Sequence, residues 1–386
     1  MRKIGRGERI RTSDPLVPNQ VLYQAEPLPE LVWMALAARV PGRSRSSQAI
    51  LDYTRKTSQP QGRNGTVQTA AKLDFSQVHV LDGGMATELE RRGCDISGPL
   101  WSAHVLDATP EIIRQVHLDY LRAGADCIST VSYQVSAQGY AELGRTAEDA
   151  ARALRESSRI AEAAREEYAR ESERPVLIAT SLGPYGAALH NGAEFHGIYN
   201  IGFSELVEFH ARRLNVVAET GADILAFETI PSQEEAWAIL EALGRYPALR
   251  AWLSFVCRDA ERVVHGESLA ECAALAGKSE QVVAVGVNCT QPGYIGALVE
   301  HAKTATEKPV IVYPNSGEAW DAANRRWYGT TSAEEYGAQA AGWFAAGAQA
   351  VGGCCRTTPQ HIRTVRAAWD AQEARQRAEA ATAMRQ

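Results

Sequence analysis

From Leu73 onward, short apolar runs rich in β-branched residues alternate with longer stretches in which apolar residues recur at helical spacing. The short runs predict buried strands and the longer stretches predict helices. Regular alternation of the two is typical of βα units around a parallel sheet. The predicted strands are residues 78–81, 127–131, 176–180, 224–227, 251–256, 282–287, 309–312 and 350–352.

The stretches between these runs carry helix signals at their ends as well as along their length. Several begin with a proline or a capping residue, and several are followed by glycine, as after residues 123, 220 and 346. The clearest predicted helices are residues 110–123, 146–170, 204–220, 233–243 and 333–346.

Eight such repeats over roughly 300 residues fit a closed (β/α)8 barrel, which typically takes about 250 residues plus insertions. An open doubly wound sheet is the alternative for an α/β chain. That fold predicts a glycine-rich phosphate-binding turn after the first strand, and Asp82-Gly83-Gly84-Met85 lacks its spacing. We therefore predict a single catalytic domain with the (β/α)8, or TIM-barrel, fold over residues 73–375.

The two ends of the chain show neither the short apolar runs of strands nor the regular alternation of the two patterns. Residues 1–72 carry 12 Lys and Arg against 5 acidic residues, a net charge of +7, and we interpret them as a disordered extension. Their Arg-rich, acid-poor composition allows a transit peptide, and a wrongly placed start codon is the other interpretation. Residues 376–386, rich in Ala, Arg and Glu, are predicted to form a helical or disordered tail.

Composition excludes some classes of protein. The chain of 386 residues has a net charge of −6, which argues against a general nucleic-acid surface. No apolar run approaches the ~18 residues that span a bilayer, so we expect no membrane partner. Seven cysteines scattered over a long chain do not resemble a secreted disulfide framework and favour a reduced, cytoplasmic setting. The net −13 of residues 73–386 is compatible with a monomer.

Polar residues directly follow most of the predicted strands, and in a (β/α)8 barrel these strand ends form the active-site rim. The first strand is followed by Asp82 and the fourth by Glu228. Cys289 follows the sixth strand, and the adjacent pair Cys354 and Cys355 follows the eighth. Because barrel closure places the sixth and eighth strands only one strand apart, the three thiols can meet.

Three thiolates on Zn²⁺ leave one tetrahedral position open, which is typical of a catalytic zinc site. Such an electron-rich ion is suited to holding a substrate thiol as its thiolate. Gly352 and Gly353 allow the backbone to leave strand geometry so that both neighbouring sulfurs reach one point. Cys354 and Cys355 could instead form a vicinal disulfide or a redox sensor. We interpret the other four cysteines as small buried hydrophobes and the nine histidines as surface or core residues.

The residues that carry this chemistry resemble a known family. The segments are Leu81-Asp82-Gly83-Gly84-Met85-Ala86-Thr87-Glu88-Leu89, Ser132-Tyr133-Gln134, Ser181-Leu182-Gly183-Pro184-Tyr185-Gly186, Phe227-Glu228-Thr229, Tyr313-Pro314-Asn315-Ser316-Gly317-Glu318, Gly286-Val287-Asn288-Cys289 and Gly353-Cys354-Cys355-Arg356-Thr357-Thr358-Pro359. Together they resemble the homocysteine S-methyltransferase family, over about residues 78–366, and are most similar to the bacterial enzymes that use S-methylmethionine.

The resemblance implies a role for each matching position. Cys289, Cys354 and Cys355 match the family's zinc ligands, and Asp82 and Glu228 match the positions that hold the homocysteine amino group. Tyr133 aligns with a tyrosine of the donor pocket in the related betaine enzymes. We also expect backbone N–H groups of the two glycines after Asp82 to be available to the substrate carboxylate.

The implied reaction is an in-line displacement in which the thiolate of L-homocysteine attacks the methyl group of a sulfonium donor, forming methionine. S-methylmethionine is the expected donor and S-adenosylmethionine the second. Methyltetrahydrofolate is not expected, because no Asp-x-His-x-x-Gly cobalamin signature is present. Betaine ranks third, because Phe227-Glu228-Thr229-Ile230-Pro231 departs from the pattern of the betaine enzymes. The remaining alternatives are a selenocysteine methyltransferase and, from another class, a non-catalytic zinc-binding or redox-sensing barrel.

Overall fold

The computed structural model describes residues 74–96, 101–321, 326–328 and 331–383. These residues belong to one compact unit. The predicted extension 1–72 and the last three residues of the predicted tail lie outside the described residues.

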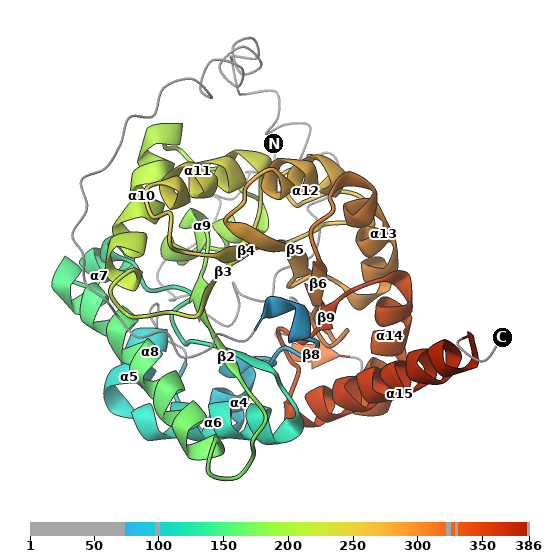
Figure 1. Cartoon of the computed structure of the whole chain (residues 1–386). Helices are drawn as coiled ribbons and strands as arrows, with labels where there is room; N and C mark the ends of the chain where they lie inside the picture. The colour runs from blue at the N-terminus through green and yellow to red at the C-terminus, as the bar shows by residue number, and fades with distance from the viewer. Residues whose placement is uncertain (1–73, 97–100, 322–325, 329–330, 384–386) are drawn as a thin grey trace, which may run out of the picture. The chain divides into compact units, whose positions relative to one another are not determined.

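Seven parallel strands form one curved sheet surrounded by helices (Figure 1). Hydrogen bonding runs in the order β1-β2-β3-β4-β5-β6-β9, so each strand lies beside the next parallel strand along the chain. The strands are β1 Cys127–Ser129, β2 Leu177–Leu182, β3 Ile224–Ile230, β4 Ala251–Phe255, β5 Val282–Asn288, β6 Val310–Tyr313 and β9 Ala350–Val351.

The predicted first strand closes this sheet into a barrel. Val80 forms a parallel bridge with Val351, and Leu81 forms one with Cys127. The Leu81 N–H donates to the Val351 carbonyl at 3.0 Å, and the Asp82 N–H donates to the Cys127 carbonyl at 3.1 Å. The predicted (β/α)8 barrel is therefore confirmed, with a first strand that is reduced to these two bridging residues.

Helices cover the outside of the sheet, and all five that the pattern predicts are confirmed. The barrel helices are α6 Pro110–Ala123, α8 Ala147–Tyr168, α10 Phe203–Val217, α11 Gln233–Gly244, α12 Leu269–Gly277, α13 Ile295–Ala305, α14 Ala333–Ala346 and α15 Pro359–Ala383. Shorter helices are α4 Met85–Arg91, α5 Trp101–Ala108, α7 Ala137–Glu142 and α9 Tyr185–Ala188, with 3-10 turns η2 Phe75–Gln77, η3 Ala193–Phe195 and η4 Pro292–Tyr294.

Capping residues explain where the helices begin and end. Thr146 and Asp149 form a capping box at the start of α8, and Ser332 and Glu335 form another at the start of α14. Helices α6 and α14 both end at a left-handed glycine, which has no Cβ to disfavour that conformation. Residues 376–383 of the predicted tail continue α15 without a break.

Side chains fill the inside of the barrel. Small residues such as Ala179, Ala226 and Ala284 face inward around the buried Trp252, whose indole N–H donates to the Tyr313 hydroxyl at 3.1 Å. A larger apolar layer lies between the sheet and the helices. The barrel is therefore a solid support, and a substrate can bind only at its ends.

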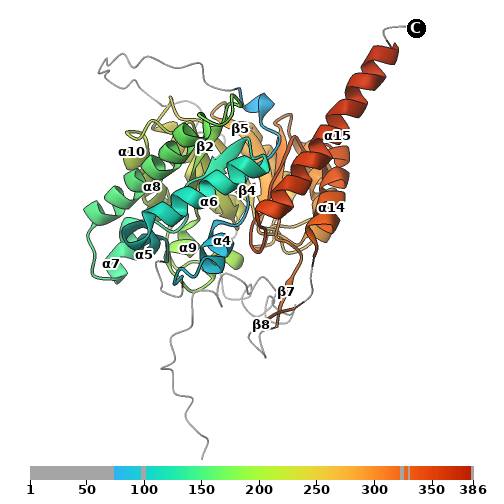
Figure 2. The ribbon, with the colours of Figure 1, turned by 90° about the horizontal axis from the view of Figure 1, so that it is seen from below.

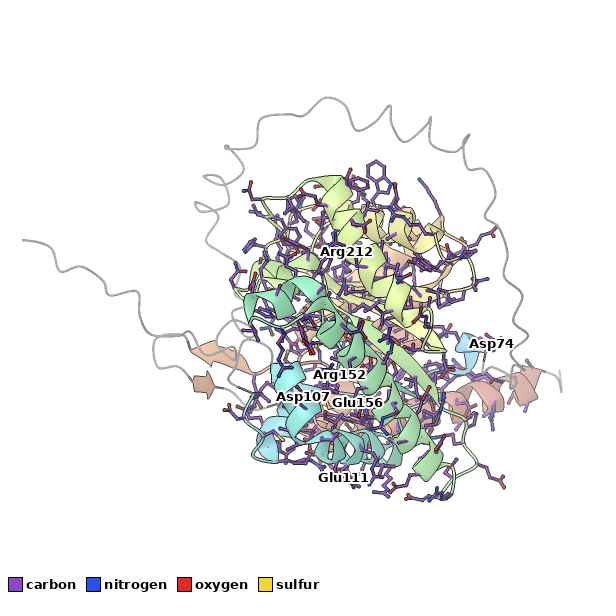
Figure 3. All side chains as sticks on the ribbon, turned by 90° about the vertical axis from the view of Figure 1, so that its left-hand side faces the viewer. Asp74, Asp107, Glu111, Arg152, Glu156 and Arg212 are labelled. Carbon is purple, nitrogen blue, oxygen red and sulfur yellow. The ribbon has the colours of Figure 1, made fainter. Side chains whose placement is uncertain are left out.

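The outer helical faces are charged. Figure 3 shows Arg152 and Glu156 on α8 and Arg212 on α10 at the surface, where each takes part in an ion pair with a neighbouring helical residue. None of the helices in the described part of the chain combines the length and apolarity needed to cross a bilayer. A hairpin that the pattern did not predict, β7 Ala319–Asp321 and β8 Arg326–Tyr328, lies at the same end of the barrel as α4 (Figure 2).

Candidate metal centre and substrate cavity

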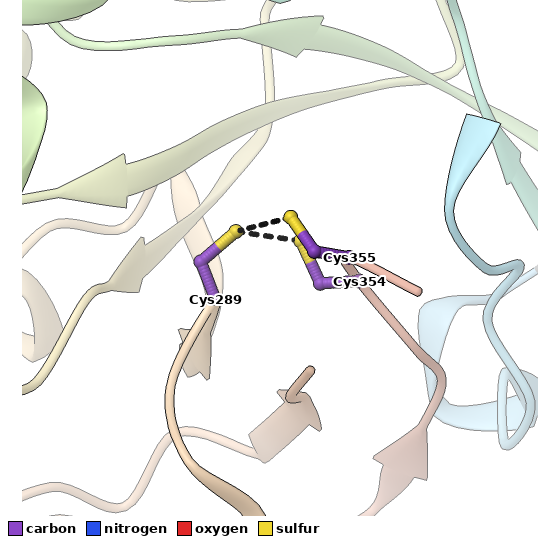
Figure 4. Close-up of side chains that lie close together, drawn as sticks. All are labelled: Cys289, Cys354 and Cys355. Carbon is purple, nitrogen blue, oxygen red and sulfur yellow. Dashed lines mark hydrogen bonds between the residues drawn. The ribbon is translucent and has the colours of Figure 1, made fainter. Parts of the chain in front are cut away.

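The three cysteines that follow strands β5 and β9 meet at the rim. The Cys289 Sγ lies 2.6 Å from the Cys354 Sγ and 3.9 Å from the Cys355 Sγ (Figure 4). All three thiols are free, so the vicinal disulfide considered from the sequence is not present. Among the described residues, this is the one group of three or more His, Cys, Asp or Glu whose ligand atoms lie within 4.8 Å of one another.

Local backbone geometry brings neighbouring sulfurs to one point, and the two glycines contribute through close approach rather than through positive φ. Gly352 and Gly353 are absent from the positive-φ residues, and the left-handed residues here are Cys289 at φ 49° and Arg356 at φ 65°. The glycines instead permit close approach: a Cβ on Gly353 would lie 2.3 Å from the Thr357 hydroxyl oxygen. The Cys354 N–H then donates to the Pro314 carbonyl at 2.8 Å, which anchors the cysteine pair beside β6.

The donor set fits a thiolate-preferring ion. Tetrahedral coordination with Zn–S bonds of about 2.3 Å separates sulfurs by about 3.8 Å. The Cys289–Cys355 distance of 3.9 Å already matches that separation, whereas the Cys289–Cys354 distance of 2.6 Å must widen. Val256, Val264 and Phe195 pack around the sulfurs and exclude water from their outer side. Hydrogen bonds from Cys289 and Cys354 hold the pKa of Cys355 well below its ordinary value, so this thiol is the first to ionise.

Asp82 lies at the end of the first strand segment, with its carboxylate 7% exposed. It accepts hydrogen bonds from the Ser129 backbone N–H at 2.7 Å and from the Ser129 hydroxyl at 3.2 Å. Burial, together with the charge of Glu228, raises the pKa of Asp82 to about 8 despite the opposing hydrogen bonds from Ser129. No described residue forms a salt bridge with Asp82.

Glu228 faces the same space from β3. Its carboxylate accepts a short hydrogen bond from the Ser181 hydroxyl of β2. Burial raises the pKa of Glu228 to about 7, opposed by hydrogen bonds from Ser181 and Tyr313 and assisted by the nearby Cys354. Asp82 is buried and Glu228 is half-buried, and neither has a cation beside it among the described residues. Both are therefore costly to ionise, and a bound ammonium group would reduce that cost.

These groups line one cavity of about 130 Å³. Its walls include Asp82, Glu228, Tyr133 and the three cysteines, so the structure brings together every site residue predicted from the sequence. Tyr133 closes the cavity above Gly183, where a Cβ would lie 2.8 Å from the tyrosine ring. Its backbone carbonyl accepts the Gly183 N–H at 3.0 Å.

The expectation that the two glycines after Asp82 offer their N–H groups to a substrate carboxylate is wrong for Gly84. The Gly84 N–H is not available to a substrate carboxylate, because it donates to the Thr357 hydroxyl at 3.1 Å. Both glycines instead allow close packing: a Cβ on Gly83 would lie 2.8 Å from the Tyr120 ring, and one on Gly84 would lie 2.6 Å from the Cys354 carbonyl. The interpretation of Cys94 as a fully buried hydrophobe is also wrong, since it is only half-buried.

Sequence reasoning gave no role to several residues that line the cavity. Thr229, Asn288, Tyr313 and Phe195 all contribute to its walls. The first three directly follow or end predicted strands, and that position was the signal that could have identified them. Phe195 comes from η3 after β2, in a loop that no period in the sequence marks.

The fold is a (β/α)8 barrel, and its rim carries three cysteines that could hold a metal ion. Residues 79–369 match the family model described as homocysteine S-methyltransferase. The chain therefore belongs to the homocysteine S-methyltransferase family, as its sequence motifs predicted, and it is a methyltransferase.

Individual relatives cover the barrel almost end to end. The homocysteine S-methyltransferase YbgG of Bacillus subtilis is 46% identical over 302 residues, which are 77% of this chain and 96% of the relative. A selenocysteine Se-methyltransferase of Brassica oleracea is 46% identical over 301 residues, 74% of this chain and 87% of the relative. The crystal structure of the metallated homocysteine methyltransferase MmuM of Escherichia coli is 41% identical, with a TM-score of 0.68 over 75% of this chain and 96% of that one.

Proposed function

We propose that this protein transfers a methyl group from S-methylmethionine, or from S-adenosylmethionine, to the thiol of L-homocysteine in a zinc-dependent reaction that forms methionine. One observation carries the proposal: three thiols within 4.8 Å of one another share a small cavity with two carboxyl groups, one buried and one half-buried, that lack a cation among the described residues. Such a cavity suits an amino acid that brings its own ammonium group and its own sulfur.

Cys289, Cys354 and Cys355 are the proposed zinc ligands. Zinc held there would supply one thing, the deprotonation of the acceptor thiol at neutral pH, where a free thiol is only a few per cent ionised. No side chain of the cavity is then needed as a general base.

The other residues of the cavity would orient the two substrates. We propose that Asp82 and Glu228 bind the homocysteine ammonium group, which directs the thiol toward the three cysteines. Tyr133 lines the same cavity, and we propose that its ring contacts the sulfonium donor and helps exclude water from the reacting atoms. Because a sulfonium loses its charge as the methyl group leaves, catalysis depends on alignment rather than on additional anionic groups at the donor.

The test is methionine formation from L-homocysteine with S-methylmethionine, S-adenosylmethionine and betaine supplied separately, before and after removal of zinc. We expect turnover with S-methylmethionine that is lost on chelation and restored by Zn²⁺. Turnover with betaine alone would overturn the proposed donor, and turnover without any metal would overturn the role of the cysteines.

Selenocysteine is a second candidate acceptor, because a relative of equal identity is a selenocysteine Se-methyltransferase. The same assay with selenocysteine as acceptor distinguishes the two. A cytoplasmic monomer completes the proposal: three metal-binding thiols require a reducing compartment, and equilibrium sedimentation tests the oligomeric state.

A further inference from the structure

Thr229, the residue after Glu228, has an unusual backbone conformation. Its φ is +59°, which is rare for a β-branched residue because Cβ is crowded there. The residue lies in a bulge of β3, where Phe227 pairs with Leu253 and Ile230 with Phe255, so that two residues of β3 oppose one residue of β4. Strained backbone persists only where its surroundings hold it, and it is concentrated at functional sites.

Asn288 holds this conformation through two hydrogen bonds, which we call the Asn288–Thr229 bridge. The Thr229 backbone N–H donates to Asn288 Oδ1 at 2.8 Å, and Asn288 Nδ2 donates to the Thr229 hydroxyl at 2.9 Å. Ser254, the residue of β4 opposite the bulge, also donates to Asn288 Oδ1, at 2.9 Å. Because a backbone N–H can only donate, the orientation of the amide is fixed. Asn288 is 1% exposed, so its polar atoms depend on these partners.

The bridge connects the two halves of the proposed acceptor site. On β3 it fixes the residue next to Glu228, and on β5 it fixes the residue next to Cys289, itself left-handed at φ 49°. Burial raises the pKa of Tyr133 well above its ordinary value, and the neighbouring Thr229 side chain opposes that shift. The bridge therefore joins the residue next to the carboxyl group that would bind an ammonium to the residue next to a sulfur that would bind a metal.

We infer that Asn288 is a positioning residue whose bridge to Thr229 sets the spacing between the ammonium and thiol subsites, and thereby selects homocysteine over cysteine as acceptor. The inference rests on the proposed function. Cysteine carries the same ammonium, carboxylate and thiol but has one methylene fewer between Cα and sulfur. In a rigid site it cannot satisfy both subsites at once, and one methylene typically changes kcat/KM about 10- to 200-fold.

The experiment compares kcat/KM for homocysteine and for cysteine, with the same methyl donor and with zinc content measured in every variant. Asn288→Ala removes the whole bridge, and Thr229→Val keeps the branched shape but removes the hydroxyl. Thr229→Ser keeps the hydroxyl. Gln281→Ala is the matched control, because Gln281 precedes the same strand β5 and its amide donates to three backbone carbonyls, of Leu243, Tyr246 and Leu249.

We expect Asn288→Ala and Thr229→Val to retain zinc, to lower kcat/KM for homocysteine, and to reduce the preference for homocysteine over cysteine by about 10-fold or more. Thr229→Ser and Gln281→Ala should keep the wild-type preference, even where Gln281→Ala lowers the melting temperature. An equal loss for both acceptors would overturn the inference, and so would loss of zinc in both Asn288→Ala and Thr229→Val. Methylation of selenocysteine by the wild-type protein as efficiently as of homocysteine would also overturn it, because selenocysteine has the chain length of cysteine. Failure of the wild-type protein to methylate either acceptor would instead overturn the proposed function.

Discussion

Buried and half-buried carboxylates occur at both ends of the barrel, and their surroundings differ. At the strand starts, Asp126 accepts the backbone N–H groups of His79 and Val80 at 3.0 and 2.9 Å, and it pairs with Arg366 of α15. Asp223 likewise accepts the Ile178 N–H at 3.0 Å and pairs with Arg165. At the strand ends, Asp82 and Glu228 are held by serines and form no salt bridge with any described residue.

The difference shows which end contributes stability and which end is prepared for a ligand. At the strand starts, arginine and backbone N–H groups stabilise the ionised form of the carboxylate that they contact. A buried carboxyl group without a cation has its pKa raised, to about 8 for Asp82 and about 7 for Glu228, and so stores unfavourable free energy that a cationic ligand releases. In barrels of this type the strand ends carry catalysis and the strand starts carry stability.

The largest effect should come from the rim cysteines. Replacing Cys354→Ser removes a soft thiolate ligand, and we expect loss of bound zinc together with a fall in turnover of more than about 10³-fold. Metal analysis and methionine formation measure the two. Cys94→Ser, outside the cluster, should change neither; turnover that survives in metal-free Cys354→Ser would contradict the proposed site.

Substitutions at the strand starts should change the stability of the protein and leave its activity unchanged. Arg366→Ala removes the closer of the two arginines that pair with Asp126 and leaves Arg174 at 3.9 Å. The hydrogen bonds from Arg366 to the Gly124 carbonyl are lost as well, and we expect a loss of about 1.5–3 kcal/mol in the free energy of unfolding measured with denaturant. At a temperature where the variant is folded, kcat/KM should stay within about twofold of wild type. Arg377→Ala, on the same helix in an exposed pair with Glu373, should cost less than about 0.5 kcal/mol. Equal costs for the two variants would mean that the buried pair adds nothing.

Glu228→Gln keeps the size of the side chain but removes the charge that would meet the substrate ammonium. A hydrogen bond to a charged group contributes about 1.5–3 kcal/mol, so we expect kcat/KM for homocysteine to fall about 10- to 100-fold. Zinc content should be unchanged. A variant with normal kinetics would show that the acceptor ammonium binds elsewhere.

Asp82→Asn should make the metal-free, ligand-free protein more stable. The folded-state pKa of about 8 lies above the unfolded value of 3.8, so folded Asp82 keeps its proton through a range in which the unfolded chain has lost it. The stability of the wild-type protein therefore decreases as pH rises from about 4 to about 8, and Asn has no such penalty. We expect a gain of about 1–2 kcal/mol at pH 8 that shrinks toward pH 4. A gain that does not depend on pH would contradict this account.

The smallest effect is the pH dependence of acceptor use. Below pH 7 both rim carboxyl groups are largely protonated, and only their ionised forms pair with an ammonium. Raising the pH from 6 to 8 should therefore increase kcat/KM for homocysteine, by up to about tenfold for Glu228 with its pKa of about 7. The Glu228→Gln profile should be flatter, and a profile identical to that of the wild type would assign the dependence to another group.

The sequence identified the chemistry of the rim better than its geometry. Asp82, Glu228 and the three cysteines were predictable because each follows an apolar run, and parallel strands that close into a barrel bring their ends together. The bulge at Thr229 was not predictable from the sequence, because it depends on how β3 pairs with β4. No local sequence pattern encodes the pairing between strands. For the same reason the sequence could not show that Gly84 packs against the Cys354 carbonyl and gives its N–H to Thr357.

The barrel closes where the first strand segment meets β9, and this has a consequence for how the protein is made. Asp82 belongs to the first strand segment, whereas Cys354 and Cys355 follow the last strand, and the Gly353 N–H donates to the Asp82 carbonyl at 2.9 Å across that join. On the ribosome the chain must be synthesised almost to its final helix before two of the three cysteines exist. Capture of the proposed zinc ion would thus be one of the last steps of biogenesis, because a chain that has not yet closed lacks two of the three proposed ligands.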